Sequence, residues 1–203
     1  MQKRSNLQPD LVLRVVADLG GLARTSDILR SEVHPRELYA AREDGTLVEV
    51  SRGLFRLASL PMTEPDLVIV ASRMPMARIC LVSALHLHGL TREIPRAVQV
   101  ALPRGRHPAR LDAPPIEVFH FAAASYEAGV EARTIDGLEL QVTTAAKSVA
   151  DAFKYRSRVG LETALDALRQ TLAQRAATPA ELFRMAAVNR VESVMRPYLE
   201  ALA

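Results

Sequence analysis

The stretch TSDILRSEVHPRELYAAREDGTLVEVSRGLFRLA, residues 25–58, decides the fold of the N-terminal part of the chain. It opens with the Thr-Ser pair at 25–26, and both residues are good N-caps for a short helix that breaks at 31–33. Pro35 suits the first turn of a longer helix over 34–42, because the N–H that proline lacks would have no partner there. We therefore expect two helices separated by a tight turn.

A β-hairpin is predicted directly after these helices. Residues 47–50 and 54–57 are short apolar runs, and the Ser-Arg-Gly turn at 51–53 separates them, with glycine supplying a positive φ. Upstream, residues 7–19 carry apolar side chains at helical spacing, and the glycine pair at 20–21 ends that helix. A helix, a second helix, a turn, a third helix and a hairpin follow one another in a winged helix-turn-helix.

The fold class predicted for the whole chain is α/β (α+β): a winged helix-turn-helix domain over 1–60 and a mixed α/β C-terminal domain over 66–203. The domain boundary is placed at 58–65, which has two prolines and no periodicity. The basic, proline-rich residues 103–115 predict an exposed loop. The remaining expected elements are helices at 66–74, 80–89, 144–156, 160–175, 178–188 and 189–202, and strands at 97–102, 116–121 and 138–142.

The helix over 34–42 is the candidate DNA-reading element. With Leu38 setting the buried direction, Arg36, Tyr39, Ala40 and Glu43 fall on the opposite side. In a helix-turn-helix this outward face enters the major groove. Arg36 could bind a guanine through two hydrogen bonds, Tyr39 could hold a phosphate or touch a thymine methyl group, and Ala40 leaves room for close approach. Glu43 disagrees with this interpretation, because a carboxylate near phosphates costs affinity. It could read a cytosine amino group or lie beyond the groove.

Further basic residues could contact the DNA backbone. Arg52 is expected at the tip of the hairpin and Arg56 on its second strand, where a wing contacts the backbone or the minor groove. Arg104, Arg106 and Arg110 lie within seven residues of one another on the predicted loop, and they could neutralise about two or three phosphates.

Composition narrows the classes of protein that the chain can represent. The formal net charge of +3 is too small to establish a polyanionic partner by itself. A single cysteine, Cys80, excludes an internal disulfide and a cysteine-based zinc site, and its apolar surroundings predict an inert core position. We find no signal peptide pattern and no run of about 18 apolar residues. A cytoplasmic protein without a membrane segment is the expectation.

Four blocks of the sequence resemble the AbiEi-type antitoxins. They are TSDILRSEVHPRELYAARED at 25–44, DGTLVEVSRGLFRLA at 44–58, CLVSALHLHGLTREIP at 80–95 and KSVADAFKYRSRVGLETALDAL at 147–168. The resemblance implies a repressor that binds inverted repeats in the double-stranded DNA of its own promoter. It also implies an antitoxin that counters a nucleotidyltransferase-like toxin without a stable complex between the two.

Two other functions remain open at this point. The first is a winged-helix module that binds protein, since residues 1–60 carry nine basic and eight acidic side chains. The second is an enzyme of nucleotidyltransferase descent, because the second domain of the family has been likened to that fold. Residues 66–203 contain no Gly-Ser pair and no Asp-x-Asp motif for Mg²⁺, so we expect no catalytic residue. His86 and His88 lack the i, i+4 spacing of a helical zinc pair, and no metal or cofactor is predicted.

One polar stripe allows two interpretations. Lys147, Asp151, Lys154 and Arg158 follow spacings of four, three and four residues along a predicted helix. The favoured interpretation is a row of ion pairs on a solvated face. The alternative is a polar seam that recognises a partner or a nucleic acid.

Overall fold

The computed structural model describes residues 9–202, and these divide into two compact units. One unit runs to Ser72 and also includes Thr134–Glu139. The other comprises Arg73–Arg133 and the chain from Leu140 onward. The start of the first predicted helix, at residues 7 and 8, lies outside the described residues. Each unit is described below by itself.

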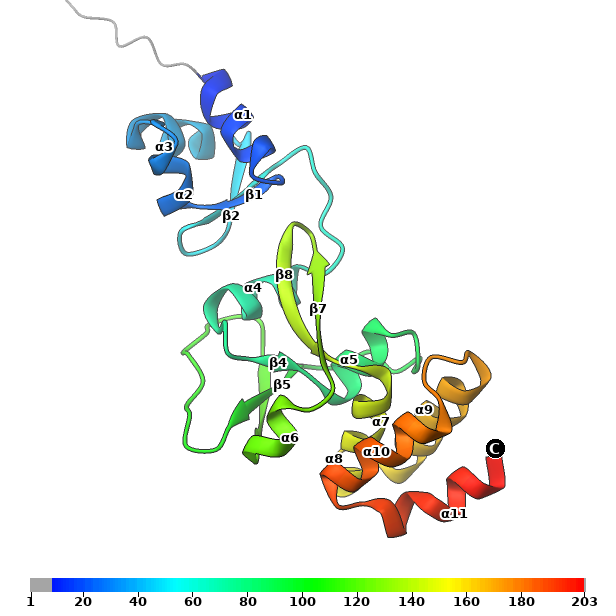
Figure 1. Ribbon diagram of the computed structural model, residues 1–203. Helices are drawn as coiled ribbons and strands as arrows, with labels where there is room; N and C mark the ends of the chain where they lie inside the picture. Colours follow the sequence, from blue (N-terminus) through cyan, green and yellow to red (C-terminus); the bar gives the residue numbers. More distant parts are fainter. Residues whose placement is uncertain (1–8, 203) are drawn as a thin grey trace, which may run out of the picture. The chain divides into compact units, whose positions relative to one another are not determined.

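The first unit contains the predicted winged helix-turn-helix, drawn in blue to cyan in Figure 1. Its order of elements is helix, strand, helix, helix and hairpin, followed by one more helix. The elements are α1 (Pro9–Asp18), β1 (Leu22–Arg24), α2 (Thr25–Arg30), α3 (Pro35–Glu43), β2 (Leu47–Ser51), β3 (Leu54–Leu57) and α4 (Pro65–Arg73).

Strand β1 was not predicted, and it completes the sheet of the wing. Its three residues pair antiparallel with β3, so that Leu22 lies opposite Arg56, and the sheet order is β1-β3-β2. A segment of three residues is too short to show the alternation that identifies a strand. One apolar core joins these elements, and its buried residues are Val12, Val16, Ala23, Ile28, Val33, Leu38, Ala41, Leu47 and Phe55.

The predicted N-cap of α2 was wrong. Arg24 is the N-cap residue and makes no side-chain capping bond. The Thr25 hydroxyl instead donates to the carbonyl oxygen of Gly53, at 3.3 Å, and the Thr25 N–H donates to the same oxygen at 2.9 Å. The start of α2 is therefore tied to the turn of the wing.

The second unit is the predicted mixed α/β part, which confirms the α/β (α+β) fold class. Its strands are β4 (Arg78–Ile79), β5 (Val98–Pro103), β6 (Ile116–Phe121) and most of β7 (Val130–Ile135) and β8 (Leu138–Thr143), whose connecting tip, Thr134–Glu139, belongs to the first unit. Its helices are α5 (Leu81–Leu87), α6 (Ala123–Glu127), α7 (Ala145–Lys154), α8 (Arg156–Val159), α9 (Leu161–Ala173), α10 (Pro179–Asn189) and α11 (Glu192–Leu202). Of these, β4, β7 and α6 were not predicted, and α8 breaks the helix that had been expected to continue to residue 156.

A five-stranded mixed sheet in the order β6-β5-β4-β8-β7 forms one layer of this unit. Strands β5 and β6 are parallel, with Val100 opposite Val118, while β4 is parallel to β8 and antiparallel to β5. Helices α7, α9, α10 and α11 pack against one another, as the yellow to red ribbons of Figure 1 show. Their shared core contains buried residues such as Val149, Phe153 and Leu168.

The compact units differ in extent from the predicted domains. Helix α4 belongs to the first unit as far as Ser72, although the prediction assigned it to the domain over 66–203. The reason is packing, since Val68 of α4 is fully buried in a cluster with Leu22 and Leu54. Arg24 also donates to the carbonyl oxygen of Ser72 at 3.0 Å.

Candidate nucleic-acid interface

Helix α3 is held at its start by a capping box that uses histidine. Nδ1 of His34 accepts a hydrogen bond from the N–H of Arg36 at 3.1 Å, and the His34 N–H donates to the Glu37 carboxylate at 3.2 Å. Pro35 occupies the first turn, as predicted. These bonds satisfy two backbone donors that the helix itself leaves without partners. The exposed first turn of α3, which carries Arg36, is therefore held by hydrogen bonds to the capping residue.

The outward face of α3 has the composition expected from the sequence. Leu38 is fully buried, and this fixes the inward direction of the helix. Arg36 is exposed, Tyr39 is 44% exposed, and Ala40 is half-buried. Glu43 is also exposed. The structure thus brings Arg36, Tyr39 and Ala40 together on one accessible helix surface.

Arg42 was missed as a member of this surface. Its side chain is 41% exposed and forms an ion pair with Glu49 of β2 at 3.2 Å. Its guanidinium carbon lies 5.1 Å from the centre of the Tyr39 ring. The i, i+3 spacing of Tyr39 and Arg42 was the signal in the sequence that could have indicated this contact.

The wing presents Arg52 at its turn. Gly53 has a φ of 73°, the left-handed conformation that the Ser-Arg-Gly turn was expected to need. The Gly53 N–H donates to the Glu49 carboxylate at 2.9 Å, and its carbonyl oxygen accepts from Thr25. Both backbone groups of Gly53 are therefore bonded, while the adjacent Arg52 side chain is exposed.

Arg56 is placed differently from the other arginines of the wing. It lies on β3 and is half-buried, and its guanidinium donates to the carbonyl oxygens of Leu57 and Leu60. These bonds direct the side chain to the segment that follows the wing. Both bonds use one guanidinium nitrogen, Nη1, so the contact of Arg56 with DNA stays a prediction.

The second unit carries the remaining predicted arginines. Arg104, Arg106 and Arg110 are exposed on the segment between β5 and β6, which contains no regular element beyond the end of β5, as expected for a loop. His120 of β6 contacts the carbonyl oxygen of Arg106 at 2.9 Å. These three arginines therefore lie on one exposed loop of the second unit.

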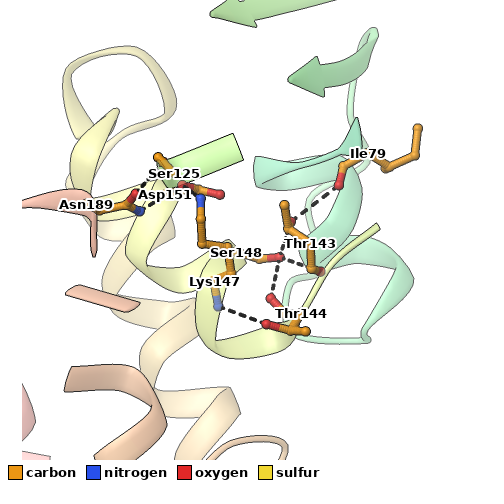
Figure 2. A network of polar contacts seen from close by, with 8 residues as sticks. All are labelled: Ile79, Ser125, Thr143, Thr144, Lys147, Ser148, Asp151 and Asn189. Carbon is orange, nitrogen blue, oxygen red and sulfur yellow. Dashed lines mark hydrogen bonds and ion pairs between the residues drawn. The ribbon is translucent and has the colours of Figure 1, made fainter. Parts of the chain in front are cut away.

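The polar stripe of α7 was misinterpreted. Lys147 and Asp151 form an ion pair, but both side chains are fully buried, so the expected solvated face is wrong for them. Figure 2 shows Asp151 also accepting from Asn189 of α10, at 2.8 Å, and Ser125 of α6 donates to Asn189 at 2.7 Å. This network therefore ties three helices of the second unit together.

Burial sets the charge properties of this network. Desolvation raises the pKa of Asp151 above its ordinary value, and the nearby Lys147 ammonium offsets part of that rise. The second carboxylate oxygen of Asp151 has no hydrogen-bond partner among the described residues. Desolvation also raises the pKa of Cys80, which is fully buried as predicted. These groups are part of the core and are shielded from solutes.

Two further observations concern metal binding and membrane-spanning helices. Among residues 9–202, no cluster of three or more histidine, cysteine or acidic side chains is arranged to hold a metal ion. Within the same residues, every helix is too short or too polar to cross a membrane.

Comparisons with known proteins give one family and one fold. Residues 10–58 match the family of transcriptional regulators described as AbiEi antitoxin. The crystal structure of the RV2827C protein from Mycobacterium tuberculosis matches with a TM-score of 0.58 at 13% identity, covering 96% of this chain and 82% of that chain. At that identity the likeness shows a shared fold only. No curated protein matches the chain.

The family match covers α1 to β3, the elements that carry Arg36, Tyr39 and Arg52. It supports DNA binding and an antitoxin role in general, and the family is one of regulators and not of enzymes. The blocks at 80–95 and 147–168 lie outside the matched residues. The resemblance of this chain to the AbiEi antitoxin family of transcriptional regulators is thus confirmed over residues 10–58.

Proposed function

We propose that this protein represses transcription by binding inverted repeats in its own promoter, and that it is the antitoxin of a nucleotidyltransferase-like toxin. The observation that supports the proposal most is the winged helix-turn-helix with Arg36 and Tyr39 on the open face of α3 and Arg52 at the wing. These are the positions from which such a fold reads a major groove and contacts the backbone.

Each contact has a separate role in this proposal. Arg36, in the first turn of α3, binds a guanine edge through its planar guanidinium. Tyr39 and the small Ala40 let the helix approach the groove, and Arg52 contacts a phosphate next to the site. Arg104, Arg106 and Arg110 add electrostatic contacts that do not depend on sequence.

A binding experiment tests the repressor. The full chain is titrated onto a duplex from the region upstream of its own coding sequence, and onto an unrelated duplex of equal length, at several salt concentrations. The proposal predicts preferential binding that weakens steeply with salt, because bound cations release counterions from DNA. Binding that is absent or insensitive to salt would instead favour a winged helix that recognises protein.

A growth experiment tests the antitoxin. The neighbouring gene, if it encodes a nucleotidyltransferase-like protein, is expressed from an inducible promoter with and without this chain. We expect growth arrest that co-expression of this chain relieves. The two proteins should not purify together from cytoplasmic extracts of these cells. Relief that requires a stable complex would contradict the proposed mode of action.

A further inference from the structure

A single carboxylate joins α3 to the turn of the wing. One oxygen of Glu49 accepts from a guanidinium nitrogen of Arg42, on α3, at 3.2 Å. The other oxygen accepts from the N–H of Gly53, next to Arg52, at 2.9 Å. We call the contacts among Arg42, Glu49 and Gly53 the helix–wing bridge.

The helix–wing bridge continues to the groove-facing side of α3. The Arg42 guanidinium lies over the Tyr39 ring, with 5.1 Å between its central carbon and the ring centre. Arg42 is therefore held between an aromatic ring and a carboxylate, each of which restricts its rotamers. The consequence is a continuous set of contacts from Tyr39 to the backbone beside Arg52.

The position of Glu49 is costly for a protein that binds phosphates. Its side chain is 32% exposed on β2, on the strand that leads to the wing turn. A negative charge there repels DNA and lowers the affinity for every sequence. A cost shared by all sequences can be offset by a gain that only the correct sequence receives.

We infer that Glu49 is a positioning residue that sets the location of Arg52 relative to α3, and that discrimination between the operator and other DNA depends on it. This inference rests on the proposed function. A specific site requires the contacts of α3 and of the wing at the same time, in one register. A wing that moves freely can reach a phosphate on any duplex, so a loose wing favours nonspecific binding.

The inference is tested with Glu49→Gln and a matched control, Glu32→Gln. Both variants remove one negative charge from an exposed glutamate of the same unit, and Glu32 lies before α3, outside both its groove-facing side and the helix–wing bridge. Binding of each variant and of the parent is measured on the upstream duplex and on an unrelated duplex at one salt concentration. Arg42→Met removes the helix–wing bridge from its other end and serves as a second variant.

The expected result is a split between the two glutamine variants. Both should bind the unrelated duplex somewhat more tightly than the parent. The ratio of affinities for the two duplexes should fall about tenfold in Glu49→Gln and in Arg42→Met, and stay near the parental value in Glu32→Gln. Amide exchange at Gly53 should accelerate in Arg42→Met, although the loss of a nearby positive charge would by itself slow base-catalysed exchange.

The outcomes that overturn the inference are distinct from those that overturn the proposed function. If the parent prefers its upstream duplex and both glutamine variants keep the parental ratio of affinities for the two duplexes, the helix–wing bridge does not contribute to discrimination. If the parent shows no preference for its upstream duplex or for any duplex selected from a random pool, the repressor proposal fails, and the role of Glu49 in it fails too.

Discussion

Two ion pairs in this chain have similar chemistry and opposite surroundings. Arg42 and Glu49 lie on the surface of the winged helix, with side chains 41% and 32% exposed, whereas Lys147 and Asp151 are fully buried in the second unit. An exposed pair contributes little to stability, because water already solvates both charges. A buried pair has lost that solvation, so each partner depends on the other. Arg42 and Glu49 are therefore accessible to a ligand, whereas Lys147 and Asp151 pair with each other inside the core.

The largest expected effect is on the buried pair. Asp151→Leu leaves the Lys147 ammonium buried without its partner, and we expect a loss of about 3–5 kcal/mol in the free energy of unfolding, measured by urea denaturation. The double variant Lys147→Met with Asp151→Leu should recover most of that loss, because no charge is then buried. If the single variant is as stable as the parent, Lys147 does not depend on Asp151 inside the core. The contrast between the buried and the exposed ion pair then does not hold.

The exposed face of α3 should respond in the opposite manner. Arg36→Ala should leave stability nearly unchanged and weaken binding to the upstream duplex by about 1–3 kcal/mol, with relaxed specificity at one base pair. Fluorescence anisotropy with single-base variants of the duplex measures both effects. An unchanged affinity would show that Arg36 does not meet a base in the complex.

At the wing we expect a smaller and less specific effect. Arg52→Ala should weaken binding to all duplexes alike and reduce the slope of log affinity against log salt by about one unit. A salt titration on both duplexes makes this measurement. Arg14→Ala is the matched control, because Arg14 is exposed on α1, outside α3 and the wing, and the salt slope of this variant should stay near the parental value.

The smallest expected effect concerns the start of α10. The Glu181 carboxylate accepts from the N–H and the hydroxyl of Thr178, at 2.8 and 2.9 Å, and these bonds lower the pKa of Glu181 below its ordinary 4.5. Its contribution to stability is therefore complete above pH 4.5 and is lost as the pH falls through the lower folded-state pKa.

A pH series tests this capping bond. The difference in unfolding free energy between the parent and Glu181→Gln should shrink as the pH falls from 6 to 3. Glu162→Gln, in the first turn of α9, is the control, since the N-cap there is Gly160 and offers no side chain. A difference that does not change with pH would exclude the carboxylate as the group responsible.

In both units, local sequence patterns predicted which helices and strands exist better than the residues at which they begin and end. The alternation of apolar and polar residues in 138–142 and the strand-like run at 116–121 identified β8 and β6, because strands of six residues are long enough to show a pattern of their own. Strands β1 and β4 have only three and two residues and depend on partners distant in the sequence. Such strands carry no periodic signal of their own.

The candidate site shows the same limit. Arg36, Tyr39 and Arg52 could be found because helical projection and turn chemistry are local properties. The contact between Arg42 and Glu49 joins a helix to a strand, and the burial of Lys147 depends on segments distant in the sequence, such as α10, which packs against α7. An i, i+4 pair has the same spacing on a solvated helix face and in a core, so the spacing cannot distinguish them.

The most direct test of the account is the binding of the full chain to the duplex upstream of its own coding sequence, measured as a function of salt. We expect a preference for that duplex over an unrelated one, a steep loss of affinity as salt increases, and a reduced preference in Arg36→Ala. Equal binding to both duplexes, or no binding to either, would contradict it.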